Sequence, residues 1–170
     1  MPSSLFMPTG IHGGRITEDF AHQDLHNEKV WRASSFGTPG AGSTYTVMFV
    51  TPSVATGKEI SVVGSVSSNG PGILTFQQAP NATGGSAIIA YNGKMSSVLT
   101  ADTVLTLDPT ITSAGTIIET RFVGAAGFKA DTGGTTISDV WLMKQATKYM
   151  IQFTADGAST RTVIKLAWHE

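Results

Sequence analysis

The feature that most constrains the fold is a repeating pattern that starts at Thr44. Short runs of β-branched and aromatic residues recur between clusters of Gly, Pro, Asn and Asp, which is typical of the strands and turns of a sandwich or barrel. No segment after residue 44 has the 3.6-residue apolar period of an amphipathic helix, so alternating strands and helices are not supported. The sequence therefore predicts an all-β fold, an antiparallel β-sandwich.

Two runs near the C-terminus give the clearest strand pattern. Residues 147–154 place Tyr149, Ile151 and Phe153 on one face, and residues 161–168 alternate in the same way. The small polar residues between the two runs include a glycine, so we predict a C-terminal hairpin. Other runs predict further strands at residues 45–51, 59–66, 73–77, 87–91, 103–107, 116–123 and 140–143.

The first 42 residues differ in composition from the rest of the chain. They contain three of the four histidines and a cluster of Gly, Pro and Ala at residues 37–42. They lack the long apolar stripe of a stable helix, and a segment of this kind is either disordered or ordered against a neighbour. We predict an extended N-terminal arm over residues 1–42 and a β-sandwich domain over residues 43–170.

Charge and composition argue against several partners. The 170-residue chain has a net charge of −1 and no cluster of Lys and Arg, whereas nucleic-acid binding needs cations that face phosphates. No stretch approaches the roughly 20 apolar residues that span a bilayer, and the N-terminus lacks the pattern of a signal peptide. Cysteine is absent, which excludes disulfides and thiolate metal sites. We expect no nucleic-acid or membrane partner, and synthesis in a cytoplasm.

No motif in the sequence indicates enzymatic chemistry. His22 and His26 have the spacing of two metal ligands on a helix, but without a third ligand solvated or interface histidines are the simpler interpretation. The acidic residues are scattered, and no serine nucleophile elbow is present. We therefore expect no catalytic residue, metal or cofactor. Trp31, Trp141 and Trp168 could stack on sugar rings, which keeps a carbohydrate-binding module as an alternative, although burial is the commoner role of large aromatic residues.

Several stretches in the middle and at the end of the chain resemble a family of tailed-bacteriophage head proteins that decorate or cement the capsid. They are residues 90–97, residues 107–118, and residues 142–151 followed by residues 167–170. The second stretch is similar to a D-P-T-x-T-x-x-G-T-x-I pattern of that family. The family commonly ends with two aromatic residues and Glu. This chain ends similarly, with Trp168, His169 and Glu170, so that His169 replaces the second aromatic residue.

This resemblance implies a jelly-roll-like sandwich on the exterior of a virion, where it would bridge subunits of the major capsid protein. A homodimer or homotrimer is expected, since closed symmetric assembly is common. The alternatives are another virion component, such as a head fibre base, a tail protein or an adsorption protein, and the carbohydrate-binding module. The arm is the first choice for the capsid contact, through aromatic, apolar and ionisable residues: His12, Arg15, Phe20, His22, Leu25, His26 and Trp31. Strand edges and turns around Lys94 and Lys129 are weaker candidates, mainly for charges at the rim of the contact.

Overall fold

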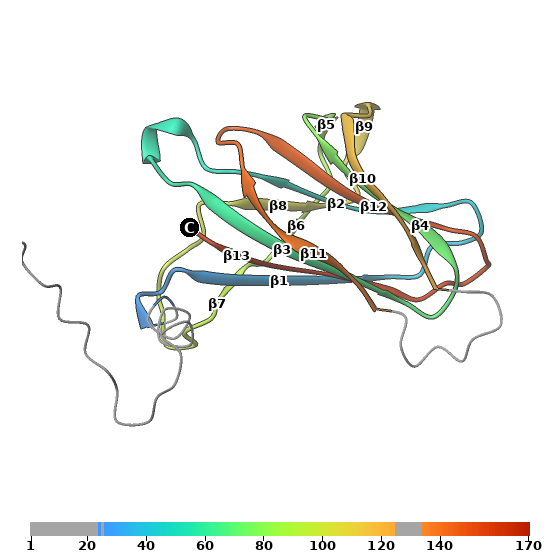
Figure 1. The fold of residues 1–170 in the computed structure, drawn as a ribbon, viewed down its shortest axis with the longest axis horizontal. Helices are drawn as coiled ribbons and strands as arrows, with labels where there is room; N and C mark the ends of the chain where they lie inside the picture. The colour runs from blue at the N-terminus through green and yellow to red at the C-terminus, as the bar shows by residue number, and fades with distance from the viewer. Residues whose placement is uncertain (1–23, 25, 125–133) are drawn as a thin grey trace, which may run out of the picture.

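The computed structural model describes residue 24, residues 26–124 and residues 134–170, without the side chains of residues 134–139. These residues form antiparallel sheets, and the two large sheets pack face to face around an apolar core (Figure 1). The predicted all-β sandwich is confirmed. No helix among the described residues is long and apolar enough to cross a membrane.

We name each large sheet after the strand of it that comes first in the chain. The β1 sheet has the spatial order β11 (Gly134–Met143), β3 (Ile60–Ser68), β13 (Thr162–His169), β1 (Val30–Gly37) and β7 (Tyr91–Asn92). The β2 sheet has the order β10 (Thr116–Val123), β4 (Gly72–Gln78), β12 (Lys148–Ala155), β2 (Thr44–Val50), β8 (Val104–Leu107) and β6 (Ser86–Ile88). The smaller elements are the 3-10 turn η1 (Val54–Thr56) and the paired strands β5 (Asn81–Thr83) and β9 (Thr110–Ser113).

The strand order is that of a jelly roll. From β1 to β4, and again from β10 to β13, each strand crosses to the opposite sheet, and the last strands insert between the first ones. This interlocking of two Greek keys defines the jelly roll. The chain between β4 and β10 is an insertion, which adds β6 and β8 beside β2, adds β7 beside β1, and forms the β5–β9 pair above the β2 sheet (Figure 1).

The predicted C-terminal hairpin is wrong. Strand β12 pairs with β2 and β4 in one sheet, whereas β13 pairs with β1 and β3 in the other. Their apolar faces meet across the core, where Ile151, Phe153, Ile164 and Leu166 are at most 4% exposed. A hairpin and a crossing between sheets need the same small, polar turn residues, so turn composition alone does not distinguish them.

The sandwich also begins earlier in the chain than predicted. Strand β1 pairs with β13 along its whole length, so the boundary after residue 42 is too late. Trp31, which we assigned to the contact surface of the arm, is 4% exposed and lies in the core opposite Trp168. The next inward positions of β1 hold Ala33 and Ser35, which are too small to give a recognisable apolar alternation.

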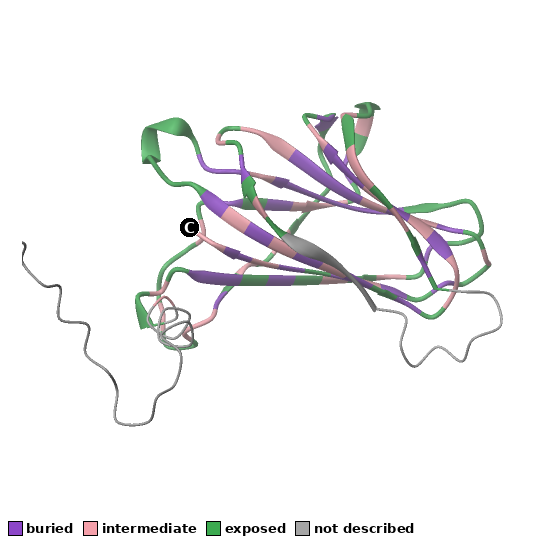
Figure 2. Cartoon of the chain, viewed as in Figure 1, coloured by how far each residue is buried: buried purple, intermediate pink, exposed green. Residues whose placement is uncertain are grey.

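Aromatic rings fill the centre of the core. Phe49, Phe76 and Tyr149 stack within the β2 sheet, with ring centroids 5.4–6.3 Å apart. Trp141 reaches across from the β1 sheet and meets Phe76 edge-on at 6.1 Å. Buried and more exposed residues alternate along β3 and β13 of the β1 sheet (Figure 2), as expected for a sheet with one covered face, whereas β2 has five consecutive buried residues. This packing fixes the two sheets against each other.

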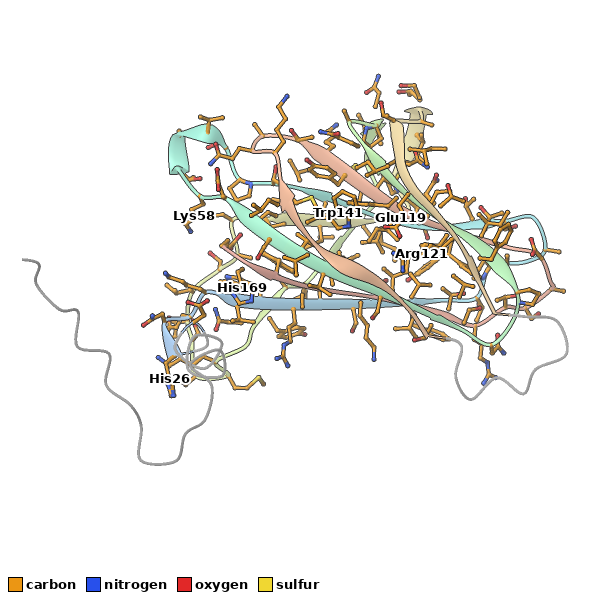
Figure 3. All side chains as sticks on the ribbon, in the orientation of Figure 1. His26, Lys58, Glu119, Arg121, Trp141 and His169 are labelled. Carbon is orange, nitrogen blue, oxygen red and sulfur yellow. The ribbon has the colours of Figure 1, made fainter. Side chains whose placement is uncertain are left out.

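The edge strand β10 carries an ion pair on its inward face. Glu119 and Arg121 form a salt bridge, and their register partners on β4 are the core residues Phe76 and Leu74. Figure 3 shows both charged side chains between the two sheets, near Trp141. A charge that points inward from an edge strand disfavours pairing with a foreign strand, so we interpret this pair as protection of the β10 edge.

Candidate partner-binding surface

The insertion between β4 and β10 carries an exposed loop, which we call the apolar loop and define as residues 89–99. Single exposed apolar residues are common on proteins, but several together indicate a binding surface. Four large aliphatic side chains of the loop are exposed: Ile89 68%, Met95 89%, Val98 93% and Leu99 55%. A hollow of about 190 Å³ lies among residues of the same loop. The loop is the first candidate surface for a protein partner.

Glu28 anchors the apolar loop beside the start of β1. Its carboxylate accepts hydrogen bonds from Lys94 Nζ at 2.6 Å and from Ser97 Oγ at 3.0 Å. Its backbone carbonyl accepts a further bond from Asn92 Nδ2 at 2.6 Å. The hydrogen bond from Lys94, and then that from Ser97, lowers the pKa of Glu28 below its ordinary value, because both stabilise the charged form. The loop is thus held where the chain enters the sandwich.

Glu170 anchors the chain that follows the apolar loop. Its carboxylate accepts hydrogen bonds from the backbone N–H groups of Asp102 at 2.8 Å and Thr103 at 3.1 Å. The Thr103 hydroxyl donates another at 2.8 Å. Asp102 in turn pairs with Lys58, and this hydrogen bond raises the pKa of the Lys58 ammonium. The last strand and the insertion are therefore tied together through side chains.

A second candidate surface is a depression of about 480 Å³ on the outer face of the β1 sheet. Two neighbouring rows across the sheet line it. The first row is Val63, Ala167, Arg32 and Tyr91, and the second is Ser65, Lys165 and Ser34. No acidic residue lines the depression. Within the described part of the chain, neither the guanidinium of Arg32 nor the ammonium of Lys165 has a hydrogen bond or an ion pair.

The structure describes only some of the residues predicted to contact a partner. His26 is exposed and lies just before Glu28. Trp31 lies in the core, so it offers no surface to a partner. Lys129 falls outside the described residues, and so do the remaining arm residues: His12, Arg15, Phe20, His22 and Leu25.

The tryptophans do not form an exposed platform for a sugar. Trp31 and Trp168 are 4% and 1% exposed, and Trp141 packs against Phe76.

Among the residues that the structure describes, no three His, Cys, Asp or Glu side chains gather as metal ligands would. The predicted pair of His22 and His26 is not tested by this, since the first of them lies outside the described residues.

Reasoning from the sequence missed the depression and anticipated the apolar loop only in part. The depression combines residues from β1, β3, β7 and β13, which only the strand order brings together. The apolar loop had a signal in the sequence, because Met95, Val98 and Leu99 fit no strand alternation. The turns around Lys94 are predicted as a weaker candidate for the partner contact, mainly for charge at its rim, so the prediction gives the place but not its apolar character. The anchoring role of Glu28 depends on a contact with a residue more than sixty positions away, which no local pattern reveals.

No known protein family matches the chain, and no curated protein matches it either. The fold and the surfaces define its class: a jelly-roll sandwich with an apolar loop and an adjoining cationic depression, which share Tyr91.

Proposed function

We propose that this protein is a structural component of a bacteriophage virion, which decorates the capsid exterior and stabilises it by bridging subunits of the major capsid protein. The observation that carries the proposal is the apolar loop, whose Met95 and Val98 are 89% and 93% exposed. An apolar group of this kind suits burial against another protein, and methionine is enriched at such contacts. The loop is fixed at Glu28, just before β1, so the loop and the residues that precede the sandwich can bind one partner together.

The resemblance to decoration proteins gives further support, and several of its residues have structural roles. Asp108 accepts a hydrogen bond from the backbone N–H of Thr46 at 2.9 Å, which holds the start of β9 to β2. Gly115 packs against the backbone of Gln78. The resemblance therefore supports a common fold more strongly than a common site. Jelly rolls serve in viral capsid domains and in lectins, so the fold is compatible with the proposal.

The proposed mechanism needs no chemistry beyond adhesion. Each copy would bury the apolar side chains of the loop against the capsid, at roughly 25 cal/mol per Å² of apolar surface removed from water. A weak contact becomes durable when it is repeated, as in a homodimer or homotrimer that binds several capsid subunits at once. The arm residues that lie outside the described part of the chain would add to this contact.

The test is binding of the full chain to capsids that lack it. We expect the natural protein to co-sediment with these capsids and to raise their melting temperature. The double substitution Met95→Ser and Val98→Ser should weaken binding by roughly tenfold or more, since truncating central interface residues commonly costs above about 1 kcal/mol each. Val54→Ser is the matched control, because Val54 is 67% exposed in η1, outside the loop.

A second pair of variants tests the arm. Phe20→Ala should weaken capsid binding, whereas Phe122→Ala, which alters an 80% exposed phenylalanine of the sandwich, should not. If the natural protein fails to bind capsids, the capsid proposal is wrong, and tail, head-fibre and adsorption structures become the partners to test. If it binds and the loop variant binds equally well, the loop is not the contact.

A further inference from the structure

The depression on the β1 sheet has a different chemistry from the apolar loop and calls for a different ligand. We propose that it binds a saccharide that carries a carboxylate, such as a chain containing a uronate or a sialate. This inference does not rest on the proposed attachment to a capsid. It rests on the unpaired charges, hydroxyls and exposed aromatic ring that line the depression.

The charge of the depression indicates an anionic ligand. Arg32 lies opposite Ala167 on the adjacent strand, so Lys165 is its diagonal neighbour on the same face, at a Cα separation of roughly 7–8 Å. Both side chains are exposed, and no carboxylate lines the depression. Two uncompensated cations at this spacing repel each other, and an anion bound between them removes that repulsion. Arg in particular forms paired hydrogen bonds with a carboxylate.

The remaining lining suits a sugar ring. Tyr91 is 61% exposed and stands next to Arg32, so its ring is available for stacking. Ser34 and Ser65 lie directly on either side of Lys165 in the register. Neither serine hydroxyl has a hydrogen bond within the described residues, so both can bind ligand hydroxyls. The volume of about 480 Å³ is within the usual range for a small-molecule site.

The position of the depression disfavours an acidic peptide. A peptide that binds as an added strand gains affinity by pairing its backbone with the edge of a sheet. The depression lies on a sheet face instead, where β13 is already paired with β1 on one side and with β3 on the other. A peptide lying there would leave its own backbone groups without sheet partners, whereas a saccharide binds through hydroxyls, a ring face and its carboxylate.

The test is titration of the full-length protein, followed by NMR, with matched acidic and neutral sugars. The acidic probes are 3′-sialyllactose and trigalacturonic acid, the neutral probe is lactose, and the peptide probe is tetraglutamate. We expect the resonances of the depression to shift with at least one acidic saccharide and not with lactose or tetraglutamate. The double substitution Arg32→Gln and Lys165→Gln should weaken that binding by roughly tenfold or more. Tyr91→Ala should weaken it as well.

Matched controls separate the site from general effects of charge and folding. Lys144→Gln removes an exposed lysine at the end of β11, and Phe122→Ala removes an exposed ring on the β2 sheet, so both should bind as the natural protein does. Unchanged melting temperatures for all variants would show intact folds. The proposal is overturned if neither acidic saccharide binds, if lactose binds equally well, or if tetraglutamate binds more tightly than either acidic saccharide.

Discussion

At the scale of single residues, close packing of backbone segments explains positions that are hard to interpret in the sequence. Gly115 precedes β10, and a Cβ atom there would overlap the carbonyl oxygen of Gln78. The glycine is required for close approach rather than for an unusual backbone angle, since its φ is not positive. Gly157, between β12 and β13, differs because a Cβ there would lie 3.7 Å from Thr160 Oγ1, an ordinary contact.

The pair of glycines gives a prediction about stability. Gly115→Ala should lower the free energy of unfolding by about 1–3 kcal/mol, because the new methyl group displaces a backbone segment that holds β4 and β10 together. Gly157→Ala should change it by less than about 1 kcal/mol, and in the stabilising direction, since it reduces the freedom of the unfolded chain. Denaturant unfolding of both variants measures the difference. Equal effects would contradict the packing argument.

At the scale of elements, alternation predicted most strands but not their partners. The expected strands at residues 45–51, 59–66, 73–77 and 116–123 are confirmed as β2, β3, β4 and β10. Each has enough apolar residues on one face for the period to be visible. The expected strand at residues 87–91 divides instead into β6 and β7, which belong to different sheets.

Two failures at this scale have a common cause. The hairpin was wrong because pairing depends on which sheet a strand joins, and strand β1 was missed because its inward residues after Trp31 are small. For the same reason the depression could not be predicted. Lys165 and Tyr91 approach the same depression only through the order β13-β1-β7. The pairing of strands far apart in the sequence depends on how the whole core packs, so it cannot be predicted from local composition.

The anchoring of the apolar loop gives a prediction for acid. Because the pKa of Glu28 is below its ordinary value of 4.5, the charged form is stabilised in the folded protein. The stabilisation that the charged Glu28 carboxylate gives the folded protein is complete above its ordinary pKa. This stabilisation is lost as the pH falls through the lowered pKa of the folded protein. NMR order parameters of residues 93–99 should therefore fall as the pH is lowered below 4.5 and Glu28 becomes protonated.

The variant Glu28→Gln is the control for this prediction, because it has no carboxylate to protonate. Its loop should be more mobile than the natural loop at about pH 6 and should change little on acidification. If the natural loop keeps the same order parameters once Glu28 is protonated, Glu28 is not its anchor.

At the scale of the whole molecule, the jelly roll is closed by strands from opposite ends of the described chain. Strand β13 lies between β1 and β3, and it is the only strand that joins them in the described sheet. Trp31 and Trp168 face each other in this seam and are both buried. The core is thus completed by contacts between residues far apart in the sequence, which makes the sandwich a single cooperative unit.

The pairing of β1 with β13 predicts what happens when β1 is removed by truncation. A chain that begins at Ser43 lacks β1, exposes one side of β13 and should lose its near-UV circular dichroism and its cooperative thermal transition. A synthetic peptide of residues 24–42 should restore both, because it supplies the missing strand and its tryptophan. A cooperative transition in the truncated chain without the peptide would show that β1 is dispensable.

The central place of β13 also sets an order of events during synthesis. While the ribosome still holds the residues of β13, strands β1 and β3 have no bridge between them, and the inner face of the β1 sheet stays open to water. Native closure is therefore a step that follows translation of this strand, and slow long-range pairing of this kind leaves apolar strands open to aggregation. Translation speed and chaperone supply while β13 is being synthesised should then limit the yield of folded protein more than the same factors while β1 is being synthesised.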